Sequence, residues 1–418
     1  MGASPVKSVI VIGGGIVGVC CAHYLAQEGC DVTLLDDAQA PGGSASMGNS
    51  GMIVPSHFSP LAAPGMPMYG LRMQLQNESP FGFAFPMSAE TAAWSRLFLA
   101  ACSTQRTELA EPALRDLHFA SRSLYLELAQ SLSFPLNDHG LVSVCLEAGE
   151  IDEAKHEIER ANTIGVPAEW LDADSLRTKL PASNASAVGA IYFPMDACAD
   201  PEVAHAALWR SLSGRVQLPP AGKVVELSVA NGLARVRIDD GRRYAAGSAV
   251  VAAGAWSGTL LRQLGVRAPM VAGKGLSVTV ESVGDTPELC ALTPSARLAM
   301  TPMGGRVRFG GTMEIGAPNF APKTDRVAGF YRSIELAYPA YAGRRWEAEK
   351  LWVGNRPLTP DGLPYVGKLQ KSPEIVVAAG HAMAGFSLAP VTGKLVSELV
   401  LGRSPSMRLD LLDPLRYA

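Results

Sequence analysis

The segment SVIVIGGGIVGVCCAHYLAQEGCDVTLLDD, near the N-terminus, limits the fold of this chain more than any other. Residues 8–12 form a short β-branched run that predicts a buried parallel strand, and residues 32–35 predict a second one. Between them, apolar residues recur at helical spacing up to Gly29, which is placed to end a helix. The segment therefore predicts a β-α-β unit and an α/β fold.

The loop between the first strand and the helix has the glycine spacing of a dinucleotide site. The first glycine makes the turn, the second lets backbone amides approach a pyrophosphate at the helix N-terminus, and the third allows close helix–strand packing. The predicted contacts are at Gly13, Gly15, Ile16, Val17 and Gly18. Asp36 lies 18 residues after Gly18, where a carboxylate accepts hydrogen bonds from a ribose diol. No arginine follows it closely, so a 2′-phosphate is disfavoured, and these residues leave FAD and NAD open.

Composition limits the possible domain number, partners and cellular setting of the chain. A chain of 418 residues with 48% hydrophobic residues predicts two domains, and a formal net charge of −3 gives no reason to expect a nucleic-acid partner. The seven cysteines form no C-x-x-C pair and no His/Cys spacing that suits zinc, so we expect no metal site and no disulfide framework. The sequence has no apparent secretion signal and no 18-residue apolar run, which favours a reduced, cytoplasmic setting and leaves surface attachment open.

Four further segments carry a family resemblance. They are GNSGMI with PLAAPGMP, VVAAGAWS at residues 250–257, RFGGTMEIG at residues 308–316, and VGNRPLTPDGLPYVG at residues 353–367. With the N-terminal unit they resemble the D-amino acid oxidase family of FAD enzymes, which includes glycine oxidase, sarcosine oxidase and the bacterial D-amino acid dehydrogenases. The first and third segments look most like the dehydrogenases.

The resemblance implies a Rossmann-like FAD-binding domain with an inserted antiparallel-sheet substrate domain, an α/β plus α+β architecture. The expected FAD-binding parts are residues 1–88, 196–270 and 352–418, and the expected substrate parts are residues 89–195 and 271–351.

The resemblance also implies where FAD binds. Beyond the glycine motif, the implied cofactor contacts are Asp36, Ser44, Ser46, Asn49, Gly51, Met52, Val224, Gly254, Trp256, Gly380, Gly385, Phe386, Ser387 and Leu388. A helix beginning near Leu388 would direct its positive end at the negative charge of a reduced flavin, while Ser387 either caps that helix or bonds the flavin. Sarcosine oxidases carry a flavin-linking cysteine where this chain has Gly354, so we expect noncovalent FAD.

Two residues are candidates for binding substrate. The resemblance assigns Arg356 to the substrate carboxylate, which a guanidinium binds through two parallel hydrogen bonds; the alternatives are an ion pair with Asp361 and a surface position. His57 follows the loop expected at the flavin and either contacts a polar group of the substrate or is structural. We interpret Lys274 as a solvated turn residue.

The implied function is an FAD-dependent dehydrogenase that oxidises the Cα–N bond of a D-amino acid by hydride transfer to flavin N5. His57 with Ser56 and Ser59 would suit D-proline or hydroxy-D-proline. The expected electron acceptor is a quinone or an electron carrier. Alternatives are a glycine- or sarcosine-type oxidase that releases H2O2, and a flavin-binding subunit of a larger complex. The apolar residues 58–75 indicate either peripheral contact with the inner face of the cell membrane or a buried loop.

Overall fold

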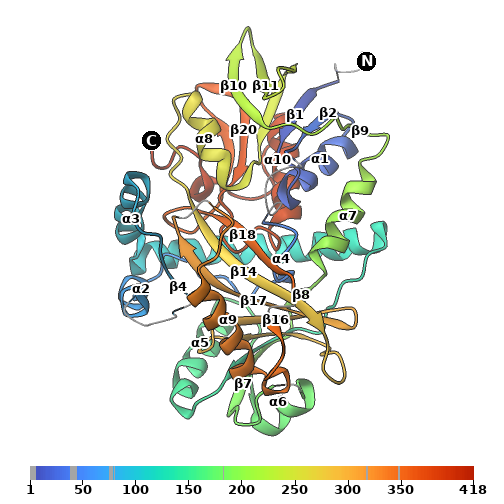
Figure 1. Ribbon diagram of the computed structural model, residues 1–418. Helices are drawn as coiled ribbons and strands as arrows, with labels where there is room; N and C mark the ends of the chain where they lie inside the picture. The colour runs from blue at the N-terminus through green and yellow to red at the C-terminus, as the bar shows by residue number, and fades with distance from the viewer. Residues whose placement is uncertain are drawn as a thin grey trace.

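The structure is a computed structural model that describes residues 6–37, 45–74, 79, 81–181, 183–316, 319–346 and 349–418. Two large sheets organise the described chain, one in the upper half of the view in Figure 1 and one in the lower half. The chain passes between them several times, so each half is assembled from segments far apart in sequence.

The first sheet is the predicted parallel sheet. Its six described strands have the order β19-β20-β13-β1-β2-β9, and every neighbouring pair is parallel except β19 with β20. The bounds are β1 (Ser8–Ile12), β2 (Asp31–Leu35), β9 (Val216–Gln217), β13 (Ser248–Val251), β19 (Tyr365–Leu369) and β20 (Ser372–Ala379). The strands expected at residues 8–12 and 32–35 are confirmed.

Both faces of this sheet are covered, which explains its continuous apolar strands. Val9 and Val11 of β1 pack toward α1 (Ile16–Gln27) and α10 (Ala389–Leu401). Ile10 and Ile12 pack toward a three-stranded sheet and α8. The covering elements are α7 (Pro201–Ser211), α8 (Ser257–Gln263), β10 (Val224–Ala230), β11 (Leu233–Ile238) and β12 (Arg243–Ala246).

The second sheet is mostly antiparallel. Its described strands have the order β18-β14-β17-β16-β15-β5-β7-β6, with β4 also paired to β17, and only β15–β5 and β17–β4 are parallel. The bounds are β4 (Phe81–Phe83), β5 (Leu141–Cys145), β6 (Glu169–Asp172), β7 (Gly189–Phe193), β14 (Val271–Glu281), β15 (Cys290–Thr293), β16 (Leu298–Met303), β17 (Arg306–Ile315) and β18 (Leu351–Leu358). The antiparallel expectation thus holds for most pairs, and Arg356 lies on the first strand of this order.

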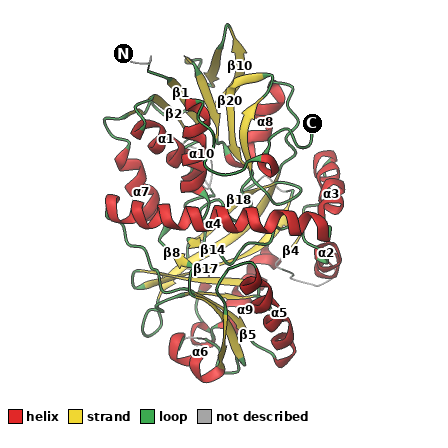
Figure 2. Ribbon diagram, turned by 180° about the vertical axis from the view of Figure 1, so that it is seen from behind, coloured by secondary structure: helices red, strands yellow, loops and turns green. Residues whose placement is uncertain are grey.

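The helix expected to end at Gly29 and the one expected to begin near Leu388 are present as α1 and α10. The remaining helices and the small β3–β8 pair have the bounds α2 (Met66–Gln74), α3 (Ala89–Ala101), α4 (Thr104–Leu132), α5 (Ile151–Thr163), α6 (Ala173–Lys179), α9 (Thr324–Ala337), β3 (Met52–Ile53) and β8 (Ala197–Cys198). Figure 2 shows α4 crossing the width of the molecule between the two sheets.

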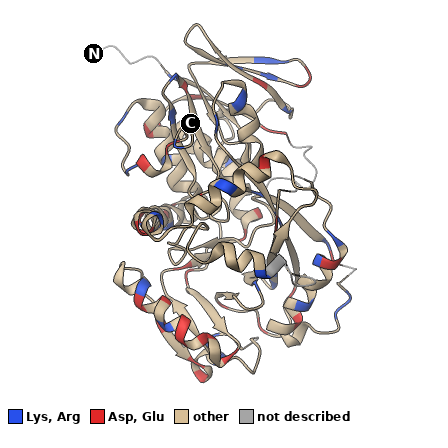
Figure 3. Cartoon of the chain, turned by 90° about the vertical axis from the view of Figure 1, so that its left-hand side faces the viewer, with Lys and Arg blue, Asp and Glu red and all other residues tan. Residues whose placement is uncertain are grey.

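The structure also bears on the expectations about charge, cysteines, membrane helices and Lys274. Basic and acidic side chains are interspersed over the side drawn in Figure 3. All seven cysteines are free, and none of the described helices is both long and apolar enough to cross a membrane. The interpretation of Lys274 as a solvated turn residue is wrong: it is 4% exposed within β14, and its Nζ lies 3.1 Å from an oxygen of Glu314. A buried ammonium needs such a partner.

Candidate active site

A cavity of about 1060 Å³ lies between the two sheets. One part is lined by the β1–α1 turn and the end of β2, and another by β14, β17 and β18. The predicted site residues on its wall are Gly13, Gly15, Ile16, Val17, Asp36, Ser46, Asn49, Gly51, Met52, His57, Val224, Gly254, Trp256, Arg356, Gly380, Gly385 and Phe386. Gly18, Ser387 and Leu388 lie behind the wall, and Ser44 lies outside the described residues.

The β1–α1 turn requires glycine at two positions. Gly13 has φ +110°, and a Cβ there would lie 2.4 Å from the carbonyl oxygen of Ala252. A Cβ on Gly18 would lie 1.8 Å from the carbonyl oxygen of Gly13. Gly18 therefore holds the helix against the turn, as the motif predicts, without reaching the cavity.

Asp36 is arranged to receive a ribose. Its Oδ1 accepts a hydrogen bond of 2.9 Å from the amide of Gly14, which fixes the carboxylate beside the turn. Asp36 lines the cavity, and its Oδ2 makes no hydrogen bond to any residue that the structure describes. This free acceptor, the exposed helix N-terminus and the cavity volume together fit the adenosine and pyrophosphate of a dinucleotide.

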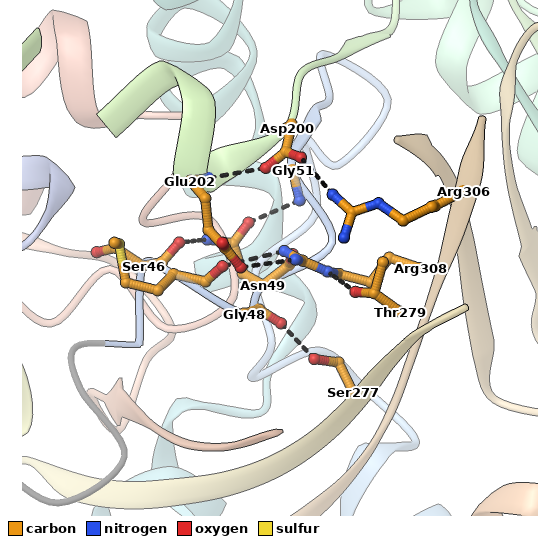
Figure 4. A network of polar contacts seen from close by, with 11 residues as sticks. Ser46, Gly48, Asn49, Gly51, Asp200, Glu202, Ser277, Thr279, Arg306 and Arg308 are labelled. Atoms are coloured by element: carbon orange, nitrogen blue, oxygen red, sulfur yellow. Dashed lines mark hydrogen bonds and ion pairs between the residues drawn. The ribbon is translucent and has the colours of Figure 1, made fainter. Parts of the chain in front are cut away.

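The small-residue loop that follows is clamped onto the second sheet. Figure 4 shows Arg308 of β17 reaching this loop, where its Nη1 donates to the carbonyls of Met47 and Asn49 at 3.0 and 3.1 Å. Ser277 of β14 donates to the carbonyl of Gly48 at 2.6 Å. The side chain of Ser46 accepts the first helical amide, that of Ile16, at 2.9 Å. The loop is therefore attached to both walls of the cavity.

We expect Arg308→Met to weaken FAD binding at least about tenfold, because two buried carbonyls would lose a charged donor and free the loop. Titration of the apoprotein with FAD, followed by flavin fluorescence, measures this. Arg306→Met is the matched control: Arg306 lies two residues away on β17, its side chain is 49% exposed, and its one ion pair with a described residue is to Asp200, at 3.9 Å. Equal FAD affinity in the two variants would contradict the role of Arg308.

The glycine loop before α10 is held by α4. Ser121 donates to the carbonyl of Ser387 at 2.6 Å, and Tyr125 donates to the carbonyl of Phe386 at 2.6 Å. Ser387 does not cap α10: its Oγ accepts the amide of Val54 at 3.0 Å and lies 2.9 Å from Nδ1 of His118. The capping alternative is wrong because Leu388 occupies the N-cap, and the first-turn amide of Val391 donates to Ser121, at 3.5 Å, and not to Ser387.

Arg356 is a cation without an anion. Its Nη1 donates to the carbonyl of Thr312 at 3.0 Å, and it makes no ion pair with any described residue. Its position depends on Gly275 across the sheet, since a Cβ there would lie 2.1 Å from Nη1. Burial lowers the pKa of Arg356 to about 10, so it stays charged at neutral pH. A cavity-lining guanidinium of this kind has the donors and the charge to bind a carboxylate.

The alternative pairing of Arg356 with Asp361 is wrong. Asp361 accepts two hydrogen bonds from Arg416, at 2.7 and 2.8 Å, and one from the amide of Leu363. Thr359 donates to the carbonyl of Leu363 at 2.8 Å. Both residues organise the loop, as expected, and this leaves the guanidinium of Arg356 available to a ligand.

Three imidazoles with lowered pKa values line the same cavity, those of His57, His118 and His381, and burial lowers the pKa of His381 to about 4. Burial lowers the pKa of His57 to about 4, and burial with the nearby charge of His57 lowers the pKa of His118 to about 3. His118 is fully buried, and its Nε2 has no partner among the described residues. The sequence analysis missed His118 because it lies on a long amphipathic helix, where a buried histidine carries no distinguishing signal.

Other residues on the wall also escaped sequence analysis. They are Tyr69, Arg297, Thr312, Trp352 and Asn355. Thr312 has φ +63°, an uncommon conformation for a β-branched residue, and it turns its carbonyl toward Arg356. Among the described residues no cluster of three or more His, Cys, Asp or Glu side chains could hold a metal ion.

The fold and this cavity define the protein as a flavoprotein oxidoreductase. The family described as DAO, FAD dependent oxidoreductase, matches residues 8–399. The chain therefore belongs to the DAO family of FAD-dependent oxidoreductases.

Solved structures share the fold over the full length. Glycine oxidase from Geobacillus kaustophilus aligns with a TM-score of 0.79 and 22% identity, covering 99% of this chain and 100% of that chain. Iminodiacetate oxidase from Chelativorans sp. BNC1 gives 0.75 and 20%, covering 97% and 98%. L-proline dehydrogenase from P. horikoshii gives 0.72 and 20%, covering 99% and 98%.

Proposed function

We propose that the protein is an FAD-dependent dehydrogenase that oxidises the Cα–N bond of a D-amino acid to the imino acid. The observation that carries the proposal is Arg356, a charged guanidinium on the cavity wall whose one hydrogen bond goes to a backbone carbonyl. Such a group binds a carboxylate through two parallel bonds, which fixes the orientation of the substrate as well as its charge. FAD held in this cavity would supply the acceptor for the Cα hydride.

The residues of the chain contribute positioning. Arg356 anchors the carboxylate, and the rigid loop after it, organised by Asp361 and Thr359, keeps the guanidinium in place. Apolar side chains of Leu276 and Met313 line the cavity nearby and limit access of water. Holding substrate and cofactor in a reactive geometry can supply a large part of the rate acceleration without an acid–base residue.

A panel of amino-acid enantiomers tests the proposal. Each is mixed anaerobically with the purified flavoprotein, and loss of flavin absorbance is followed in a single turnover. We expect D-alanine, D-proline or hydroxy-D-proline to reduce the flavin faster than its L-enantiomer. Faster reduction by the L-enantiomers or by glycine and sarcosine would contradict the assignment to D-amino acids, and no reduction by any amino acid or amine would support the noncatalytic subunit.

The electron acceptor is proposed to be a quinone or an electron carrier and not O₂. Release of H₂O₂ at the rate of substrate loss would instead establish an oxidase. Exposed apolar side chains support a proposal of peripheral membrane contact: Met68 is 57% exposed and Leu71 is 58% exposed on α2, and Phe85 is 66% exposed. Phe58, in contrast, is buried at 3% exposure.

FAD is proposed to be bound noncovalently. No cysteine lines the cavity among the described residues, and Cys290 is buried against the carbonyl of Gly140. A side chain at residue 354 would overlap the indole of Trp352, since a Cβ on Gly354 would lie 1.9 Å from it. We expect acid precipitation to release all of the flavin into the supernatant. Yellow colour that stays with the precipitate would contradict this.

A further inference from the structure

Asp196, Ser56 and His57 form a hydrogen-bonded chain that ends at the cavity. Asp196 is fully buried between β7 and β8. Its Oδ1 accepts the amide of Ser56 at 3.0 Å, and its Oδ2 accepts the hydroxyl of Ser56 at 2.5 Å. The same Oγ of Ser56 lies 3.1 Å from Nδ1 of His57.

The chemistry of these groups gives the chain a direction. A hydroxyl has one proton, and in Ser56 that proton is donated to the Asp196 carboxylate. The oxygen of Ser56 must then accept from His57, which places the proton of the neutral imidazole on Nδ1. Nε2 is left with a bare lone pair, and it makes no hydrogen bond to any described residue.

The lone pair of His57 faces space that a ligand can occupy. His57 lines the main cavity and also a second one of about 400 Å³. The two cavities also share Ser59, Leu292 and Pro294, so His57 stands at the boundary between them.

We propose that Asp196, acting through Ser56, fixes His57 as a hydrogen-bond acceptor that positions the substrate nitrogen by accepting one of its N–H groups. This inference rests on the proposed function for the identity of the donor, since the carboxylate goes to Arg356. His57 is the residue that touches the substrate, and Ser56 and Asp196 are positioning residues. The arrangement excludes a substrate that presents only an acceptor at this point.

The protonation state of Asp196 sets the direction of the chain. Protonated Asp196 would donate to Ser56, Ser56 would donate to Nδ1, and Nε2 of His57 would become a donor. Burial raises the pKa of Asp196 to about 7 against the lowering effects of the Ser56 hydrogen bonds and of Arg122. The acceptor form of His57 therefore predominates above about pH 7 and is lost as the pH falls.

Other charged groups surround this pair. The titratable and charged side chains that face His57 or Asp196 are His118 and Arg122 of α4, Glu153, His156, Glu157 and Arg160 of α5, Cys198 of β8 and Cys290 of β15. Arg122 forms an ion pair with Asp138, and Arg160 forms one with Glu111. These charges affect the pH at which Asp196 becomes protonated. They do not change the outcome, which is loss of the acceptor form of His57 as the pH falls.

The first test reads the proton directly. In the full-length flavoprotein labelled with ¹⁵N-histidine, NMR shifts distinguish a protonated from a bare ring nitrogen, and His57→Gln assigns the signals. At pH 8 we expect Nδ1 protonated and Nε2 bare. In Asp196→Asn, the amide group would donate to Ser56, reverse the chain and place the proton on Nε2. A protonated Nε2 in the wild type at pH 8, or an unchanged tautomer in Asp196→Asn, would overturn the proposal.

The second test is kinetic. Asp196→Asn and Ser56→Ala are expected to raise the substrate KM about tenfold, the value of one hydrogen bond to a charged or strongly polar group. Ser211→Ala is the matched control, because its hydroxyl lies 2.9 Å from Nδ1 of His23, outside the cavity. We also expect wild-type kcat/KM to fall below about pH 7 and this step to vanish in Asp196→Asn. An unchanged KM in both variants would refute the positioning role.

The two tests separate this inference from the proposed function. The NMR measurement needs no substrate, so the expected tautomer with no flavin reduction by any amino acid would reject the proposed function alone. Flavin reduction by a D-amino acid with the opposite tautomer would reject the inference alone.

Discussion

Arg356→Met is expected to lower kcat/KM by between about thirtyfold and several thousandfold, because truncating one partner of a buried charge pair costs roughly 2–5 kcal/mol. Methionine fills a similar volume and donates no hydrogen bond. Most of the loss should appear in KM, since the carboxylate is held before and during the reaction. The kcat/KM of Arg356→Lys should lie between those of the wild type and of Arg356→Met, because lysine keeps the charge and loses the two parallel bonds. A KM for Arg356→Met within about threefold of wild type would reject the clamp.

Arg356→Met should lower activity without lowering the stability of the folded protein. In the absence of substrate, Arg356 is a cation whose one hydrogen bond is to the carbonyl of Thr312, and its lowered pKa reports the cost of burial. Replacing it with an apolar side chain removes that cost, so we expect the Tm to be unchanged or higher. A lower Tm would indicate a structural role. Loss of activity with retained stability is typical of a residue kept for function.

Gly13→Ala is expected to abolish retention of FAD during purification. A methyl group at this position would lie 2.4 Å from the carbonyl oxygen of Ala252, and alanine is strained at φ +110°. Strain and overpacking together cost roughly 2–6 kcal/mol at the turn that the glycine motif predicts to contact the pyrophosphate. The flavin-to-protein absorbance ratio and titration with FAD measure the effect.

Gly29→Ala is the control for Gly13→Ala. Gly29 also has positive φ, +78°, but its Cβ would meet nothing within 4 Å. Gly29→Ala should lower the free energy of unfolding by only about 1–2 kcal/mol and leave FAD binding intact. If both variants lost flavin equally, general destabilisation and not the turn itself would be the cause.

Local patterns were sufficient to predict the β-α-β unit, most helices and the approximate ranges of the main strands. The glycine motif specifies a backbone shape that few sequences share, and a proline-rich loop around one arginine is visible without any structure. Asp196 could not be found this way, because its partner Ser56 is 140 residues distant and neither residue belongs to a periodic pattern. The burial of Lys274 escaped prediction for the same reason, since Glu314 on another strand neutralises it.

Ser387 and Thr312 illustrate a second limit. A serine before a helix favours a cap by local preference, yet tertiary contacts with Val54 and His118 use its hydroxyl instead. A threonine within a strand gives no warning of φ +63°. Both departures from local preference occur beside the cavity, where function outweighs propensity.

The hydrogen bonds from α4 to the glycine loop limit when the flavin pocket can form during synthesis of the chain. Tyr125 and Ser121 hold carbonyls of residues 261 and 266 positions further along the chain. In the parallel sheet, β1 pairs with β13 and β13 pairs with β20, so the centre of that sheet also needs three separated segments. The flavin pocket can therefore close only after the ribosome has released residues 372–388. Until then the nascent chain exposes apolar strands, and exposed strands of this kind are prone to aggregate.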